Sequence, residues 1–353
     1  MSRHSWRSVL LVGVFAAAVV VACDLAVQRV VPIQHQTEVE DAIAELRDSD
    51  PTVLVLGSSH ARTWEVVGEE VARRTNGANR ILAVPVEFGK LRVYDWVLRH
   101  RILPLLDDLG PEGRPRRPSV SHVILVTEWW DSLDDGTPPA NLPSRAWTSR
   151  DFLEDAAEHG LVAYNRNWLT SRWLRLTRGS ILAQDRGYGR VSKGLVRAIR
   201  GDDPESARQD TVFRVRKWQR MIEAGAEGVC APEDMAALAD MISILEDRDL
   251  DVTIVLYPRK PATITPRAKE TTLATYAREV RRVAEPAGVP VHDWSTENPL
   301  TDRDFRDDFD HVTPEGNRLL TEWMLDGDLR WLVAPDAGAN VTADAKPAGG
   351  GRS

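Results

Sequence analysis

A chain of 353 residues is long enough for one α/β domain with a large core, or for such a domain carrying an insertion. The net charge of -8 argues against a general nucleic-acid binder, which would present a basic face. The two cysteines, Cys23 and Cys230, stand in different sequence contexts and provide no disulfide framework, so they say little about the redox compartment.

The first segment, residues 1–32, is predicted to be a signal anchor or a lipoprotein signal. Arg3 and Arg7 precede an uncharged run, residues 8–23, that is rich in Val and Ala. Basic residues on its amino side predict a membrane-anchored protein whose body lies outside the cytoplasm, on the periplasmic or extracellular face. The run also ends like a bacterial lipobox, which would make Cys23 a lipidated first residue. The transmembrane and lipoprotein alternatives both remain open.

The α/β body begins after this segment. In residues 33–50, Val39, Ile43 and Leu46 have helical spacing. Four branched apolar residues at 53–56 then indicate a buried strand of a parallel sheet. Gly57 allows a sharp turn into a helical pattern that runs from about residue 60 to 74.

Ser58 and Ser59 stand between this strand and this helix. Open α/β sheets bind ligands at the carboxyl ends of their strands, where free N–H groups of a helix start favour negative charge. Serine is also a preferred N-cap residue. The pair therefore has two interpretations, helix capping or a nucleophilic serine.

Further strands and helices alternate along the chain. Strands are predicted at residues 80–84, 122–127, 251–258 and 289–293, and helices at 91–106, 231–248, 271–285 and from about 313. This alternation predicts a parallel sheet with right-handed crossovers. We expect an α/β fold with three layers, α/β/α, around a five-stranded parallel flavodoxin-like sheet.

The composition changes between residues 136 and 228, which we interpret as a helical insertion. Its tryptophans are set among Arg-rich helical patterns, and they include Trp147, Trp168, Trp173 and Trp218. Core packing and stacking on sugar rings are both open for these rings. The arginines fit either an anionic glycan or the polar face of helices. The predicted domains are therefore the α/β body at 33–135 and 229–333, the insertion at 136–228, and a disordered tail at 334–353.

A second motif stands near the C-terminus. Asp308 and His311 form an Asp-x-x-His pair just before a helix with Thr313 as N-cap and Pro314 in its first position. A nucleophilic serine needs a base, and the base needs a group that fixes its tautomer. An early Gly-x-Ser and a late Asp-x-x-His in one α/β chain are more specific together than alone. His292 is a rival base, but it lies within a strand and lacks this arrangement.

These motifs carry a resemblance to the SGNH (GDSL-like) hydrolase superfamily. Gly57, Ser58 and Ser59 stand where that family has Gly-Asp-Ser, and residues 308–311 stand at its last block. The Gly-Ser-Ser form and the late run at residues 309–316 resemble membrane-tethered envelope members of the family, such as alginate O-acetyltransferase-like and D-alanyl-lipoteichoic acid biosynthesis proteins. The resemblance covers about residues 50–130 and 250–325. It implies that Ser59 is the nucleophile, His311 the base and Asp308 its orienting carboxylate.

The resemblance also addresses the oxyanion hole. Gly89 matches the glycine that donates a backbone N–H in the second block, although a plain turn glycine is an equal alternative. The third block has Thr127 and Glu128 where the family has an asparagine, so the family's third donor is missing. Loss of one donor costs about 10²–10³ in rate. Glu128 is expected either to contact substrate or, more simply, to be a solvated loop carboxylate.

No cofactor is expected, since the chain lacks the phosphate-loop and dinucleotide fingerprints. No metal site is expected either, because the acidic run 302–310 lacks EF-hand spacing and contains Arg303 and Arg306. The expected function is that of an envelope-anchored serine esterase or O-acyltransferase acting on acyl groups of a cell-wall or exported polysaccharide. Its partners would be an acylated carbohydrate, the membrane through the N-terminal segment, and envelope proteins, without nucleic acid. The alternative is an inactive SGNH-like scaffold that binds glycan or partner proteins.

Overall fold

The computed structural model describes residues 34–86, 89–107, 120–134, 204–306 and 311–334, with a few positions between 14 and 22. The chain divides into two compact units, residues 1–38 with 136–214 and residues 39–135 with 215–353. The predicted lipidation of Cys23, most of the predicted insertion and the predicted tail lie outside the described residues. Among the residues that are described, no helix is long and apolar enough to cross a membrane.

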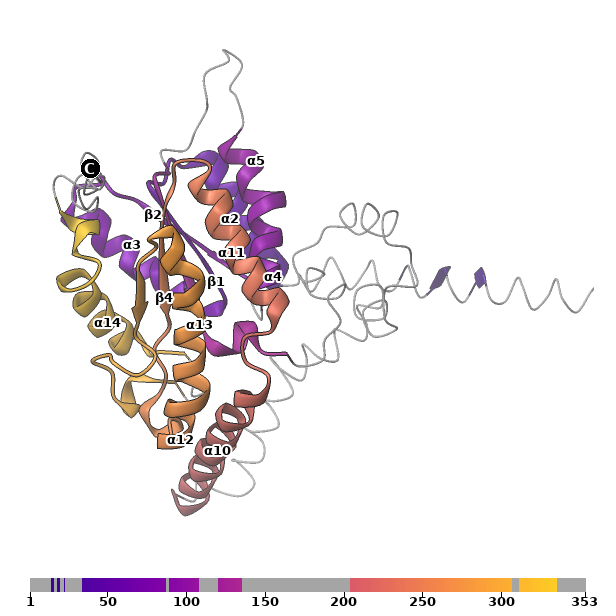
Figure 1. Ribbon diagram of the computed structural model, residues 1–353, viewed down its shortest axis with the longest axis vertical. Helices are drawn as coiled ribbons and strands as arrows, with labels where there is room; N and C mark the ends of the chain where they lie inside the picture. The colour runs from indigo at the N-terminus through magenta and orange to yellow at the C-terminus, as the bar shows by residue number, and fades with distance from the viewer. Residues whose placement is uncertain are drawn as a thin grey trace, which may run out of the picture. The chain divides into compact units, whose positions relative to one another are not determined.

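The second unit is built on five parallel strands in the order β2-β1-β3-β4-β5 (Figure 1). They are β1 (Val53–Gly57), β2 (Ile81–Pro85), β3 (His122–Thr127), β4 (Asp251–Leu256) and β5 (Val291–Asp293). This order is flavodoxin-like, and it confirms the predicted sheet. Strands β1 and β3 are buried at every position, as expected for continuous apolar runs covered on both faces.

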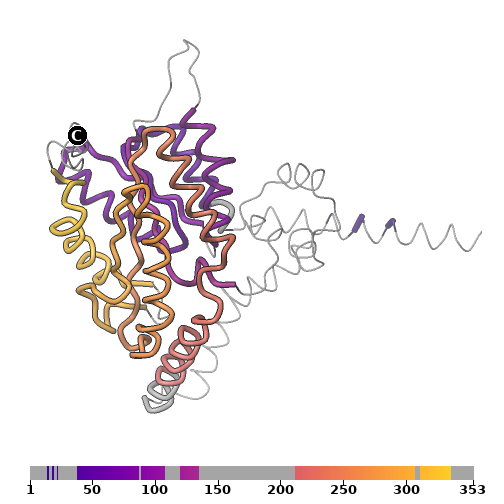
Figure 2. Tube along the Cα trace, in the orientation of Figure 1, coloured from indigo at the N-terminus to yellow at the C-terminus, as the bar shows by residue number. Residues whose placement is uncertain are grey.

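Helices cover both faces of the sheet (Figures 1 and 2). On one face α3 (Thr63–Arg74) packs against α14 (Pro314–Asp326). On the other face α11 (Pro232–Glu246) packs against α4 (Leu91–Val97) and α13 (Ala274–Ala284). The three-layer α/β/α prediction is therefore confirmed.

The remaining helices follow the predicted pattern with local differences. They are α2 (Gln34–Asp48), α5 (Leu103–Leu106), α10 (Pro204–Ala224) and α12 (Pro266–Ala268). The helix predicted at 91–106 consists of α4, the π-helical turn Leu98–Ile102 and α5. In α2 the three apolar residues with helical spacing are buried. Hydrophobic periodicity thus located these elements, whereas it does not distinguish α from π turns.

The end of β1 depends on a glycine. A Cβ atom on Gly57 would lie 2.4 Å from the Val126 carbonyl oxygen of the neighbouring strand β3. That approach is too close for any side chain, so only glycine lets the two backbones pack this way. The residues that follow Gly57 are therefore held close to the carboxyl end of β3.

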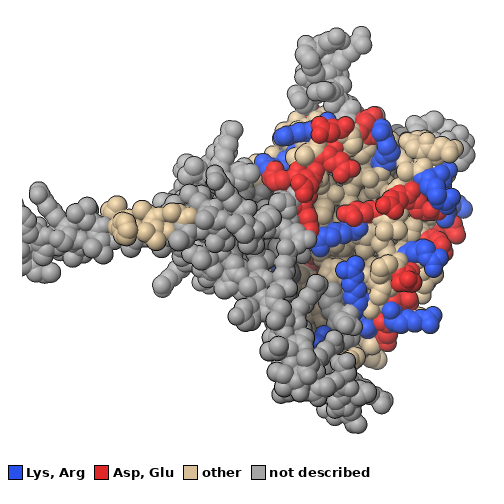
Figure 3. Space-filling model, turned by 180° about the vertical axis from the view of Figure 1, so that it is seen from behind, with Lys and Arg blue, Asp and Glu red and all other residues tan. Residues whose placement is uncertain are grey.

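Charges of both signs are interspersed over the visible face of the described part of the chain, seen from behind in Figure 3. Lys and Arg side chains alternate there with Asp and Glu side chains over short distances. This face therefore does not form a continuous region of one sign that would steer a highly charged polymer.

Candidate functional site

The two serines after β1 have different roles. Ser58 is the N-cap of the 3₁₀ turn Ser59–Arg62, and its Oγ accepts a hydrogen bond from the His60 N–H at 3.4 Å. Ser59 is the first residue of that turn, which continues into α3. Ser58 therefore takes the capping role at the 3₁₀ turn, and Ser59 lies at the carboxyl edge of the sheet.

The loop that carries His311 is fixed on both sides. The Arg306 N–H donates to the His311 carbonyl at 2.7 Å, and Phe305 forms an antiparallel bridge with Val312. Beyond it, Thr313 caps α14 by accepting from the Gly316 N–H at 3.1 Å, as its sequence predicted. These bonds define the position from which His311 projects.

Helix α14 is in turn attached to α3. The Asn317 side-chain N–H donates to the Thr63 carbonyl at 3.1 Å, and this bond is buried. Thr63 is the first residue of α3 and lies four residues after Ser59. The start of the last long helix is therefore held against the serine turn.

As a result the two motifs meet. Ser59 Oγ lies 2.8 Å from His311 Nε2, although 252 residues separate them, and both side chains are half-buried. This distance is within the range for a serine and the base that activates it. Asp308 and its neighbour Asp310 lie outside the described residues, so the orienting carboxylate stays a prediction.

Thr127 does not have the position of a substrate-binding residue. Its side chain is buried, and its Oγ1 is 3.1 Å from Asp131 Oδ2 and 2.5 Å from the Tyr276 hydroxyl. Burial raises the pKa of Asp131 well above its usual range. Thr127 therefore belongs to a buried hydrogen-bond network behind the site, and this is a correction to its predicted role.

Glu128 also differs from the expected solvated carboxylate. It is only 7 % exposed, and it pairs with the Arg259 guanidinium through Oε2. Its Oε1 lies 3.3 Å from His60 Nδ1. The prediction of a solvated carboxylate was wrong because β3 and β4 end side by side. This pairing places Arg259, which follows β4, against Glu128, which follows β3.

Gly89 has the geometry of a turn. Its N–H donates to the Val86 carbonyl at 2.9 Å, and a Cβ atom there would lie 2.3 Å from the Tyr94 ring. The glycine is thus explained by a turn and by close packing against the buried Tyr94. The structure supports the turn alternative and gives no support to Gly89 as an oxyanion donor.

Three further residues at this edge escaped prediction. They are His60, Tyr257 and Arg259, and all are at most 2 % exposed. The His60 ring stacks on Tyr257 at 4.1 Å and on His311 at 5.1 Å between centroids. The sequence contains a signal for all three residues. Tyr257 and Arg259 come within three residues of the end of strand β4, and His60 directly follows Ser59. Their chemistry converges because the carboxyl ends of parallel strands share one edge.

The rival base His292 has other partners. Its Nδ1 lies 3.3 Å from Asp328, and its ring stacks on Trp294. Burial lowers its pKa. His292 is thus engaged away from Ser59, and His311 is the histidine that lies within hydrogen-bond distance of it.

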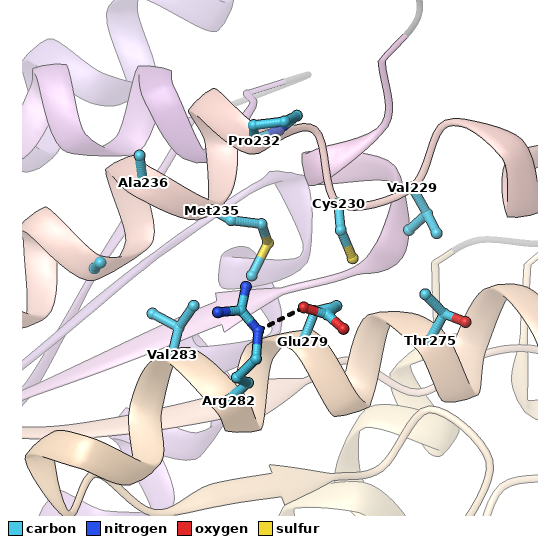
Figure 4. A pocket seen from close by; sticks show the side chains of 10 residues that line it. Val229, Cys230, Pro232, Met235, Ala236, Thr275, Glu279, Arg282 and Val283 are labelled. Atoms are coloured by element: carbon cyan, nitrogen blue, oxygen red, sulfur yellow. Dashed lines mark hydrogen bonds and ion pairs between the residues drawn. The ribbon is translucent and has the colours of Figure 1, made fainter.

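A separate pocket of about 580 Å³ lies between α11 and α13, and Figure 4 shows Cys230 and Met235 facing it. An ion pair between Glu279 and Arg282 lies below them in the same view. Burial raises the pKa of the Cys230 thiol to about 11. The thiol is thus protonated near neutral pH, unlike a reactive cysteine. Within the described ranges, no group of three or more His, Cys, Asp or Glu side chains is arranged to hold a metal ion.

Comparison with known proteins gives distant structural likenesses. No family model and no curated protein sequence matches the chain. A Bacteroides fragilis protein assigned as an acylhydrolase is similar at 10% identity and a TM-score of 0.40, over 84% of this chain and 96% of that one. A lipase/acylhydrolase from Enterococcus faecalis is similar at 12% identity and a TM-score of 0.36, over 78% and 93%. At these TM-scores the likeness is too loose to carry over the role of any residue.

Proposed function

We propose that this protein is a serine acyl-ester hydrolase or O-acyltransferase of the SGNH type, with Ser59 as nucleophile and His311 as base. The observation that carries the proposal is the 2.8 Å approach of Ser59 Oγ to His311 Nε2 at the carboxyl edge of the sheet. In flavodoxin-like sheets this edge binds ligands at the switch point between β1 and β3, and Ser59 follows β1 directly.

The chemistry follows from this pair. Ser59 Oγ forms a bond to the acyl carbon, its proton passes to His311 Nε2, and the carbonyl oxygen becomes an oxyanion. Collapse of the oxyanion breaks the ester bond, and the departing alkoxide takes the proton from the imidazolium. Water or a sugar hydroxyl then removes the acyl group from Ser59 by the same steps in reverse. Asp308 is proposed to hold the other imidazole nitrogen.

The oxyanion is proposed to be bound at the start of the helix. Ser59 is the first residue of its turn, where helix geometry leaves the N–H group without an acceptor inside the helix. The positive end of the helix adds to this stabilisation. Gly89 and Thr127 are engaged elsewhere, so fewer donors serve the oxyanion than in the family pattern. This deficit favours a slow or specialised enzyme.

The same deficit supports a second candidate, a non-catalytic scaffold that binds glycan or partner proteins. For either candidate we propose an envelope-anchored protein whose ligand is a cell-wall or exported polysaccharide. The basic start and the uncharged run at residues 8–23 support the anchor, and the external position supports the ligand class.

A fluorophosphonate probe separates the two candidates, because only an activated serine reacts with it. We expect labelling of the full chain at Ser59 and none of Ser59→Ala. Ser295→Ala is the matched control, since Ser295 is a buried serine that donates to Asp293 beside β5, at the far edge of the sheet. An unlabelled wild-type protein, or equal labelling of Ser59→Ala, would refute the enzyme and leave the scaffold.

A further inference from the structure

The ring of His60 lies against the proposed catalytic base. Its centroid is 5.1 Å from that of His311, with 29° between the two planes, and the rings are stacked. It also stacks on Tyr257 at 4.1 Å. His60 is 1 % exposed, so it does not compete with His311 for a substrate. Its position suits a role that acts on His311 itself.

Polar contacts fix the His60 ring in its plane. Its Nδ1 lies 2.9 Å from Ser58 Oγ and 3.3 Å from Glu128 Oε1. Ser58 also caps the turn that presents Ser59. The residues that flank the nucleophile thus hold a second imidazole, which in turn contacts the base.

Glu128 is held by a buried ion pair. Its second oxygen pairs with Arg259, whose guanidinium lies 5.0 Å from the Trp218 ring centre. Arg259 is 2 % exposed. Burying two charges in this way carries a large desolvation penalty, and an apolar pair often serves stability equally well. Stability alone therefore does not account for this ion pair. Its Glu128 side chain also contacts His60, the ring that stacks on His311.

We infer that His60 is a positioning residue for His311: its ring is the platform that fixes the plane of the base, and Glu128 with Arg259 holds that platform in place. The catalytic consequence rests on the proposed function of Ser59 and His311. The contacts themselves do not depend on it.

The charges around His60 make this inference testable. Among the described residues, the groups that face it include Ser58 from the serine turn, Glu128 and Asp131 from the exit of β3, Tyr257 from the exit of β4, and His311. Burial raises the pKa of Asp131, which favours its neutral form. Arg259 pairs with Glu128. Replacing either partner by a neutral side chain changes the net charge near the stacked rings by one unit. At an effective dielectric constant of about 20, such a charge shifts an ionisation by roughly one pH unit.

The first test is an NMR titration of the full chain labelled in its histidines, with His311→Asn to assign the signal. We expect Glu128→Gln to lower the titration midpoint of His311 by roughly one pH unit, since one negative charge is then removed from beside the stacked rings, and Arg259→Met to raise it by a similar amount, since one positive charge is removed. The matched control is the double variant, which leaves the net charge beside the rings unchanged and should titrate closer to the wild type than either single variant. Midpoints that move by less than about 0.2 pH unit in both single variants would overturn the coupling.

The second test changes only the platform. We expect His60→Ala to lower kcat for a p-nitrophenyl ester roughly 100-fold with KM nearly unchanged, because a misplaced base acts on the transition state. His60→Phe keeps a planar ring but loses the Nδ1 contacts with Ser58 and Glu128, so it should recover only part of that loss. Equal losses in both variants, or a loss confined to KM, would refute a platform.

Failure of this inference differs from failure of the proposed function. If the wild type neither takes the fluorophosphonate nor hydrolyses esters, the proposed function falls. The histidine titration needs no activity and still decides whether Glu128 and Arg259 act on His311. If the wild type is active but the His311 midpoint is unchanged in the Glu128 and Arg259 variants, the inference about His60 is refuted and the proposed enzyme is not.

Discussion

Acidification should destabilise this protein through His122, the first residue of β3. Its Nε2 lies 2.8 Å from Thr253 Oγ1 of the neighbouring strand, and its ring contacts Trp331 at 4.2 Å between centroids. The side chain is 8 % exposed, and this burial lowers its pKa from 6.5 to about 4. The folded protein therefore holds His122 neutral over a pH range in which the unfolded chain is protonated there.

The sign and the size follow from proton linkage. Between pH 6.5 and pH 4 the unfolded state binds more protons at this site, so the free energy of unfolding falls as the pH falls. With these two pKa values, RT ln[(1 + 10^1.5)/(1 + 10^-1)] gives a loss of about 2 kcal/mol between pH 8 and pH 5. Below pH 4 the loss approaches a plateau, because the folded state then binds the proton as well.

Urea unfolding of wild type and His122→Gln at pH 8 and pH 5 measures this contribution. Glutamine retains a polar group for Thr253 but does not titrate. The variant should be less stable at pH 8, and its loss on going to pH 5 should be smaller than that of the wild type by about 2 kcal/mol. Other titrating groups cancel in this double difference. Equal losses in the two proteins would show that His122 is not held neutral by burial.

Two more substitutions test the serine turn and the predicted orienting carboxylate. Gly57→Ala forces a Cβ to within 2.4 Å of the Val126 carbonyl, so it should cost about 1–3 kcal/mol and displace Ser59 enough to abolish fluorophosphonate labelling. Gly77→Ala, at a left-handed glycine with open space around it, should cost about 1–2 kcal/mol and leave labelling intact; loss of labelling in both would make it a mere stability effect. Asp308→Asn should lower ester turnover on the order of 10²–10⁴-fold, whereas Asp310→Asn should stay within about twofold, and the reverse order would exchange their roles.

Most of the fold followed from local patterns. The strand at 122–127 and the cap Thr313 with Pro314 stand as expected, because apolar runs and capping residues act over a few neighbours. The alternation of strands and helices predicted a parallel sheet, and it was the only local pattern that bore on the order of the strands. The short strand β5 begins two residues later than expected, at Val291. Boundaries depend on pairing with β4, which a single sequence does not show.

The meeting of Ser59 with His311 was predictable because each motif has its own local signature. Gly89 and Thr127 show the limit of that approach. For both, the partner that decides the role comes from packing, namely Tyr94 against the glycine and Tyr276 against the threonine hydroxyl. Residues separated by 149 positions, such as Thr127 and Tyr276, leave no local pattern that links them.

The role of Glu128, at the site itself, is also decided by a partner that is distant in the sequence. A carboxylate after a strand is usually solvated, and only the parallel pairing of β3 with β4 turns it into the partner of Arg259. Once paired, its second oxygen faces His60. The exit of β3 thus carries a carboxylate that contacts His60, the ring stacked on His311. In the proposed enzyme this strand exit supports the base through His60, and the charge variants of Glu128 and Arg259 measure that support.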